Sequence, residues 1–171
     1  GKLYWAVYNA QNNNSTLFRM PADGSQAPTT ITTALRQIYK LAWRRYTDTN
    51  SQSQEALVWL TDDARLFRYR IGSAGVPQEL ASTVADFAIH TTFNLLSSTT
   101  SIYAAIGAIA VDSNTAPGKV LQINIETGNQ STVYNATGHD QVLAVGTDSA
   151  ASLLLNAPTK NIYIAVASVA C

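Results

Sequence analysis

Apolar residues along this chain gather in short runs separated by polar turns rich in glycine, proline and aspartate. Four of the runs resemble one another: KLYWAV at 2–7, ALVWLT at 56–61, SIYAAI at 101–106 and NIYIAV at 161–166. Short runs rich in β-branched and aromatic residues predict buried strands. The nearest approach to a helical pattern is RQIYKLAWRR at 36–45, and its place in the repeat described next favours a strand.

The four runs mark a repeat of about 50 residues, in which Leu3, Leu57, Ile102 and Ile162 are equivalent. Further elements follow each of the first three runs in a constant order: an alternating run closed by a glycine turn, a polar β-branched run, and a short run containing alanine. In that order they are TLFRMPADG (16–24), RLFRYRIGSAG (65–75) and KVLQINIETG (119–128), then PTTITTAL (28–35), QELASTV (78–84) and QSTVYNAT (130–137), then YKLAW (39–43), ADFAI (85–89) and QVLAV (141–145).

Four short strands per repeat predict an all-β fold, a β-propeller of four-stranded antiparallel blades with about three blades in residues 1–171. The blade repeats begin near residues 3, 57, 102 and 162. Alanine-containing strands suit the crowded centre of a ring, continuous apolar runs suit burial between neighbouring blades, and Thr- and Gln-rich strands suit a solvated rim. An all-β sandwich with loosely similar strands is the alternative.

The order of an LAV-type strand, KLYW, LFR with DGS, and a polar strand resembles the YWTD β-propeller of low-density-lipoprotein receptors and nidogen. In place of that tetrapeptide the chain has YWAV at 4–7, VWLT before Asp62, YAAI at 103–106 and YIAV at 163–166. The resemblance implies a six-bladed ring, of which this chain would supply about half. We therefore expect a fragment of a larger chain, with the rest of its own polypeptide or other protein chains as partners. Two copies closing one ring are the alternative.

Charged residues make up 13% of the chain and the net charge is zero, so no long-range attraction to nucleic acid or to an anionic membrane is expected. Ser, Thr, Asn and Gln take the place of the missing charges, which suits exposed β-structure. The apolar stretch IYAAIGAIAV at 102–111 is about half as long as a membrane helix requires. We interpret it as a buried strand and expect no membrane insertion.

Modification signals are more specific than catalytic ones. Asn13, Asn14, Asn129 and Asn135 each begin an N-x-S/T sequon, and we expect them in a loop, a turn and an outermost strand, where N-linked glycans can be accommodated. Cys171 is the single cysteine, so we expect any disulfide partner to lie outside this chain.

Catalytic and metal-binding patterns are sparse, and we predict no catalytic residue, no metal site and no cofactor. His90 and His139 have no Cys, His or carboxylate at metal-ligand spacing. Asp62 and Asp63 predict a hairpin turn. The stretch DTNSQSQE at 48–55 lacks the glycine and glutamate of a calcium loop, so we expect a solvated loop.

Basic and aromatic residues alternate in one strand, where Arg65, Arg68 and Arg70 flank Phe67 and Tyr69. Such a strand can stack nucleic-acid bases. The charge balance argues against that role, and we expect the arginines on the exposed face of the strand.

These observations favour a non-catalytic binding or structural module of a large extracellular or cell-surface glycoprotein, secreted and acting through its loops. The alternative is a propeller hydrolase or lactonase whose catalytic residues lie mostly in other blades. A bacterial periplasmic scaffold is a third interpretation.

Overall fold

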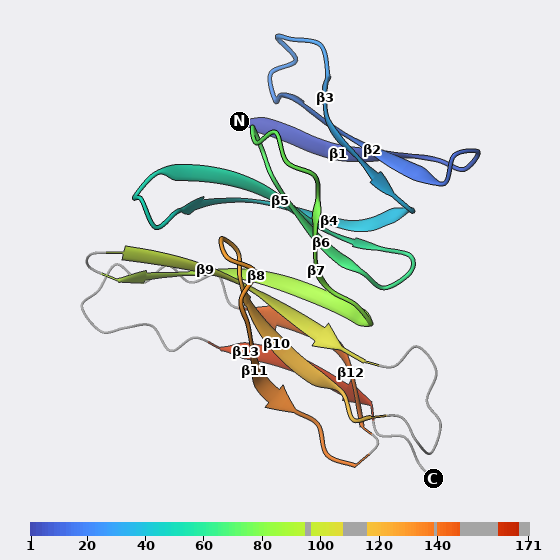
Figure 1. Ribbon diagram of the computed structural model, residues 1–171, viewed down its shortest axis with the longest axis vertical. Coiled ribbons are helices and arrows are strands. Elements are labelled where there is room, and N and C mark those ends of the chain that lie inside the picture. Colours follow the sequence, from blue (N-terminus) through green and yellow to red (C-terminus); the bar gives the residue numbers. More distant parts are fainter. Residues whose placement is uncertain (95–96, 108–115, 139, 148–160, 168–171) are drawn as a thin grey trace.

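The computed structural model describes residues 1–94, 97–107, 116–138, 140–147 and 161–167 (Figure 1). Thirteen strands form four antiparallel sheets, and the described residues contain no helix. The predicted all-β, antiparallel class is therefore confirmed. The strand expected from RQIYKLAWRR is also confirmed, as β4 (Ile38–Thr47).

Each sheet consists of strands that are consecutive in the chain (Figure 1). The first sheet has three strands, the second and third have four each, and the fourth has two. In order of pairing they are β1 (Lys2–Asn9), β2 (Asn14–Pro21) and β3 (Thr29–Leu35); β4, β5 (Ser53–Thr61), β6 (Leu66–Arg70) and β7 (Gln78–Ala81); β8 (Val84–Asn94), β9 (Ser97–Ile106), β10 (Lys119–Asn124) and β11 (Gln130–Asn135); β12 (Gln141–Thr147) and β13 (Ile162–Ala167).

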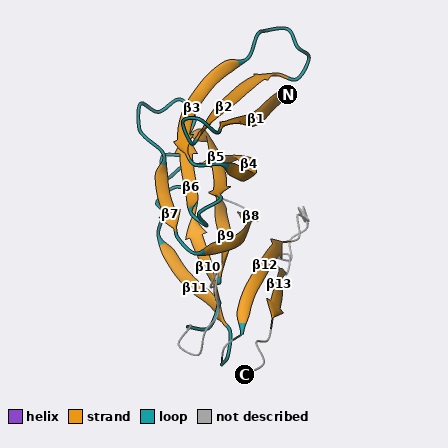
Figure 2. Ribbon diagram, turned by 90° about the vertical axis from the view of Figure 1, so that its right-hand side faces the viewer, coloured by secondary structure: helices purple, strands orange, loops and turns teal. Residues whose placement is uncertain are grey.

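The sheets stack face to face in chain order, so the second and third sheets are covered on both faces (Figures 1 and 2). This explains why ALVWLT and SIYAA are apolar at successive positions: alternate side chains of one strand enter different cores. Ala56 through Leu60 and Ile102 through Ala105 are all fully buried. The predicted burial between neighbouring sheets is confirmed for these two runs. It is wrong for KLYWAV and for residues 162–166, in which several side chains are exposed, and residues 108–111 of the strand predicted at 102–111 lie outside the described residues.

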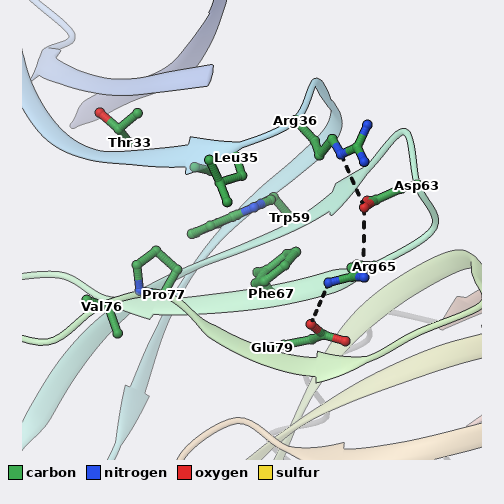
Figure 3. A pocket seen from close by; sticks show the side chains of 11 residues that line it. Thr33, Leu35, Arg36, Trp59, Asp63, Arg65, Phe67, Val76, Pro77 and Glu79 are labelled. Carbon is green, nitrogen blue, oxygen red and sulfur yellow. Dashed lines mark hydrogen bonds and ion pairs between the residues drawn. The ribbon is translucent and has the colours of Figure 1, made fainter. Parts of the chain in front are cut away.

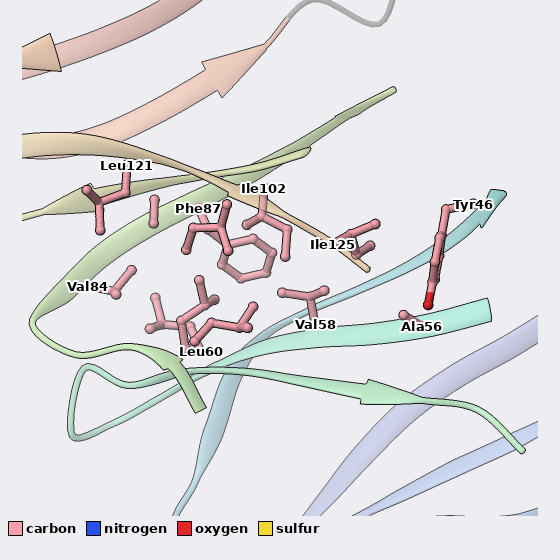
Figure 4. Close-up of a cluster of buried hydrophobic side chains, with 13 residues drawn as sticks. Tyr46, Ala56, Val58, Leu60, Val84, Phe87, Ile102, Leu121 and Ile125 are labelled. Atoms are coloured by element: carbon pink, nitrogen blue, oxygen red, sulfur yellow. The ribbon is translucent and has the colours of Figure 1, made fainter. Parts of the chain in front are cut away.

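The largest core lies between the second and third sheets (Figure 4). Val58 and Leu60 of β5 contact Phe87 of β8 and Ile102 of β9 there. On the other face of β5, Leu57 and Trp59 pack against the first sheet.

A third core joins the third and fourth sheets. Tyr103 and Ala105 of β9 pack against Ile162 and Ile164 of β13. Leu57, Ile102 and Ile162, which the repeat places in equivalent positions, each face the sheet that precedes their own.

Polar contacts tie the first strands of successive sheets together. The Lys40 ammonium on β4 forms an ion pair with Asp86 on β8, donates to the Phe87 carbonyl at 2.7 Å and lies 4.9 Å from the centre of the Phe87 ring. The second oxygen of Asp86 accepts from the Val145 N–H on β12 at 3.3 Å. Arg44 donates to the Ile89 carbonyl at 3.2 Å. One carboxylate thus links three sheets.

Another carboxylate, that of Glu55, fixes the first sheet to the second. It forms ion pairs with Lys2 at 3.3 Å and Arg45 at 3.1 Å, and it accepts from the Tyr4 hydroxyl at 3.4 Å. Burial raises the pKa of Glu55, but hydrogen bonds from Arg45 and Lys2 outweigh burial and leave it below its usual value. The ionised form of Glu55 therefore stabilises the contact.

Candidate functional site

A cleft of about 550 Å³ lies between the first and second sheets, beside the outer strands β3 and β7 (Figure 3). The lining combines an apolar floor with a charged rim. It consists of Thr33, Ala34, Leu35, Arg36, Trp59, Asp63, Arg65, Phe67, Val76, Pro77 and Glu79. Because the cleft combines exposed apolar residues with a polar rim, it is a candidate binding site.

The floor is built by strand pairing in the second sheet. Trp59 on β5 pairs with Phe67 on β6, and their rings stack with centroids 5.9 Å apart and an interplanar angle of 20°. Alternation along β5 directs Trp59 toward the first sheet, where it is 0% exposed. Leu35 and Val76 lie at the cleft with 79% and 86% of their surfaces exposed. The floor therefore offers apolar contact area to a bound group.

One polar atom in this floor is unsatisfied. The Trp59 indole Nε1 is buried and has no hydrogen-bond partner among the described residues. Leaving such a donor unpaired costs about 1–3 kcal/mol. The lining of the cleft thus contains an unused donor.

The rim is a chain of alternating charges (Figure 3). Asp63 lies 3.5 Å from Arg36 and 3.4 Å from Arg65, and Arg65 lies 3.3 Å from Glu79. The Thr61 hydroxyl also donates to Asp63 at 2.6 Å. Two cations and two anions balance, and each is already paired, so the rim favours neither a cationic nor an anionic ligand.

The turn that carries Asp62 and Asp63 is the predicted hairpin turn between β5 and β6. The Ala64 N–H donates to the Thr61 carbonyl at 3.0 Å, and Ala64 has a φ of 60°. The aspartates therefore act in the turn and the rim, and the hydroxyl that donates to Asp63, that of Thr61, is fully buried.

A second hollow, of about 310 Å³, is mainly polar and lies where loops of the second and third sheets meet. Asp48 accepts from the N–H groups of Asn50 and Gln52 at 3.0 and 2.8 Å, and the Gln52 hydrogen bond is the main reason its pKa is lowered. Glu126 accepts from the N–H and the hydroxyl of Thr49, both at 3.0 Å. Both carboxylates serve the loop. The predicted loop is observed over residues 48–52, but the prediction is wrong for 53–55, which begin strand β5.

No group of three or more His, Cys, Asp or Glu able to hold a metal ion occurs among the described residues. His90 is buried in β8 with 8% of its surface exposed. His139 lies outside the described residues. Nor do the described residues include a helix long and apolar enough to cross a membrane.

The predicted positions match the structure for Asn13, Asn129 and Asn135 but not for Asn14, which lies half-buried in a strand instead of in the loop. Asn13 is exposed in the turn between β1 and β2 with a φ of 48°, and Asn14 begins β2. Asn129 is exposed in the turn before β11, and Asn135 ends β11, an outer strand, and is exposed. Their glycosylation stays a prediction. Cys171 lies outside the described residues, so its disulfide also stays a prediction.

The prediction that the arginines of β6 are all on an exposed face is wrong for two of them. Arg68 is directed toward the third sheet, where its guanidinium donates to the carbonyls of Ile125 and Glu126. Burial lowers the pKa of Arg68. Arg70 donates to the Tyr46 hydroxyl at 3.1 Å. Arg68 thus joins two sheets, whereas the Arg70 hydrogen bond lies within the second sheet. Arg65, which precedes β6, is the exposed arginine of the three.

Sequence reasoning missed the cleft and the link through Asp86. The cleft could have been anticipated from a Trp–Phe pair that recurs at equivalent repeat positions, Trp5 with Phe18 and Trp59 with Phe67. The link through Asp86 could have been anticipated from the charged residues in two otherwise apolar runs, Lys40 in YKLAW and Asp86 in ADFAI.

Comparison with known proteins identifies no relative. No family model matches the chain, and no curated protein and no solved structure matches it. The resemblance to YWTD repeats therefore stays a prediction.

Proposed function

We propose that the four sheets are successive blades, two of them complete, of a β-propeller that acts as a non-catalytic binding or structural module of an extracellular glycoprotein. The observation that carries the proposal is the repeated orientation of the second strand of each unit. Leu57, Ile102 and Ile162 all face the preceding sheet, as successive blades of one ring require.

The stacking also supports a propeller over the sandwich alternative. A sandwich of two sheets leaves one face of each sheet in water. Here the second and third sheets are covered on both faces, and the first strands β4, β8 and β12 are joined through Lys40, Asp86 and Val145. A common inner edge of first strands is the arrangement expected around a central channel. The six-blade number and the partners, further blades or other chains, come from the YWTD resemblance.

The candidate site supports binding over catalysis. Asp63, Arg65 and Glu79 are engaged with one another at the rim of the cleft. The hydroxyl bonded to Asp63, that of Thr61, is 0% exposed and so is closed to a substrate. The exposed apolar side chains of Leu35 and Val76 suit a ligand that brings an apolar group to the cleft, whereas the Trp59 indole N–H is buried beneath it. The extracellular location and N-linked glycans are proposed on the exposed sequons.

Negative-stain electron microscopy of the longest natural polypeptide that contains this chain tests the fold. We expect discs with a central hole. Rods or compact two-layer particles would refute the propeller.

Production in a secreting animal-cell line tests the remainder. We expect secreted protein whose mass falls on treatment with an N-glycosidase, and no hydrolysis of a panel of nitrophenyl esters and lactones above the buffer rate. Turnover that a change of Asp63 to Asn abolishes would refute the non-catalytic assignment and support a hydrolase.

A further inference from the structure

The outer face of the first sheet, turned away from the second sheet, is apolar. Leu3, Trp5 and Val7 of β1 lie on it opposite Met20, Phe18 and Thr16 of β2. Leu3 and Val7 are 51% and 52% exposed, and Trp5 stacks on Phe18 with ring centroids 5.6 Å apart. We call Leu3, Trp5, Val7, Phe18 and Met20 the tryptophan face. None of these side chains is charged, so covering them removes no charge from water.

The same construction exists inside the molecule, where it is covered. Leu57 and Trp59 of β5 occupy the repeat positions of Leu3 and Trp5, and Trp59 stacks on Phe67 as Trp5 does on Phe18. There the first sheet buries both residues completely. The tryptophan face is therefore built like a surface that another sheet covers.

The covering surface on the first sheet includes Tyr4 and Ala6, which pack in the core with Leu57 and Trp59. On β13 the equivalent residues are Tyr163 and Ala165, which point away from the core that contains Ile162 and Ile164. Tyr163 is 60% exposed and Ala165 is exposed. We call Tyr163 and Ala165 the tyrosine face. The chain thus carries both halves of its own inter-sheet contact, one at each end of the stack (Figure 1).

We propose that the tryptophan face binds the tyrosine face of a second copy of this chain. The contact joins two different surfaces, so each dimer keeps one free face of each kind, and further copies add until the rotation closes a ring. Neither β12 nor β13 contains a charged residue, so no buried charge opposes the contact. The inference depends on the repeated faces and not on the proposed extracellular role.

A complementation experiment tests the head-to-tail geometry. Trp5→Lys places a charge in the tryptophan face, and Tyr163→Lys places one in the tyrosine face. Sedimentation velocity then measures the association of each protein over a range of concentrations. The protein is made in bacteria so that it carries no N-linked glycan. Asn14 lies on the same face of β2 as Phe18, and a glycan on it would obstruct the tryptophan face. We expect the unchanged chain to associate with rising concentration.

Each variant alone should be monomeric, with a dissociation constant raised about 30-fold or more, as for loss of a central aromatic contact. An equimolar mixture should form a dimer and nothing larger, because the intact tyrosine face of one variant meets the intact tryptophan face of the other. The matched control is Val133→Lys, at a residue of the outer strand β11 that is 42% exposed and lies outside both faces, and it should associate as the unchanged chain does.

Several outcomes would overturn the inference. A folded, monomeric unchanged chain would show that other sheets fill these faces, and it would leave the proposed function standing. A mixture that stays monomeric, or a Tyr163→Lys variant that associates normally, would exclude the head-to-tail contact. Circular dichroism checks that each variant is folded, and Val7→Lys and Ala165→Lys replace any variant that is not.

Discussion

Trp5 and Trp59 occupy the same position in two repeats but differ in surroundings, and we predict very different costs for removing them. Trp59 is 0% exposed beneath the first sheet, whereas Trp5 lies on the outer face of that sheet. Each stacks on one phenylalanine at nearly the same distance, 5.9 Å for Trp59 and 5.6 Å for Trp5. Changing each to alanine therefore separates the contribution of burial from that of the ring pair.

The expected magnitudes follow from packing. Trp59→Ala removes a fully enclosed side chain and should lower the free energy of unfolding by about 3–5 kcal/mol. The Trp59 Nε1 has no partner among the described residues, so the change breaks no hydrogen bond that offsets or adds to this cost. Trp5→Ala loses mainly the stacking with Phe18, which is worth about 1 kcal/mol.

Urea unfolding followed by far-ultraviolet circular dichroism measures both values without depending on tryptophan emission. The protein concentration must be low enough that association does not contribute to stability. Equal costs for Trp5→Ala and Trp59→Ala, or a cost for Trp59→Ala below about 1 kcal/mol, would refute the stacking of the first sheet on the second.

Three further predictions test the contacts between sheets. Gly118→Ala places a methyl group against the backbone of β12 and should lower the free energy of unfolding, measured in urea, by more than about 3 kcal/mol. As the control, the new methyl group of Gly75→Ala meets no atom closer than 3.6 Å, and this change should leave the free energy of unfolding unaltered. Equal losses in the two variants would contradict the close approach at Gly118. Asp86→Asn should cost about 1 kcal/mol because it removes the ion pair with half-exposed Lys40, and no loss would mean that water screens the pair. The pKa of Glu55 is below its usual value of 4.5, so the stability that Glu55 contributes is present above pH 4.5 and is lost as the pH falls through the lowered pKa. Between pH 6 and pH 3, the urea midpoint should therefore fall less in Glu55→Gln than in the unchanged chain. Equal falls in the two proteins would exclude this role of Glu55.

The sequence predicted the strands well because burial on both faces leaves a strong local trace. A strand between two cores needs apolar side chains at successive positions, as in Leu57, Val58 and Trp59, and this pattern is visible without knowledge of its neighbours.

What could not be predicted depends on how sheets are spaced. Alternation along β6 predicts which face of the strand Arg68 lies on. It does not predict that this face meets the turn after β10, where the guanidinium donates to the carbonyls of Ile125 and Glu126. Because a long side chain can cross between sheets or extend into water, an arginine pattern alone does not distinguish the two. The cleft is equally non-local, since Leu35, Trp59 and Val76 meet there only through stacking of separate sheets.

The pairing of every strand with its neighbour in sequence has an evolutionary consequence. A tandem duplication of any one unit would add a complete sheet without separating a single existing strand pair, and a deletion of one would bring equivalent faces together. Removing the second sheet, for example, would place Tyr4 and Ala6 against Ile102, which occupies the repeat position of Leu57. The architecture can thus lengthen and shorten by whole units, and selection can then act on the loops of each unit separately.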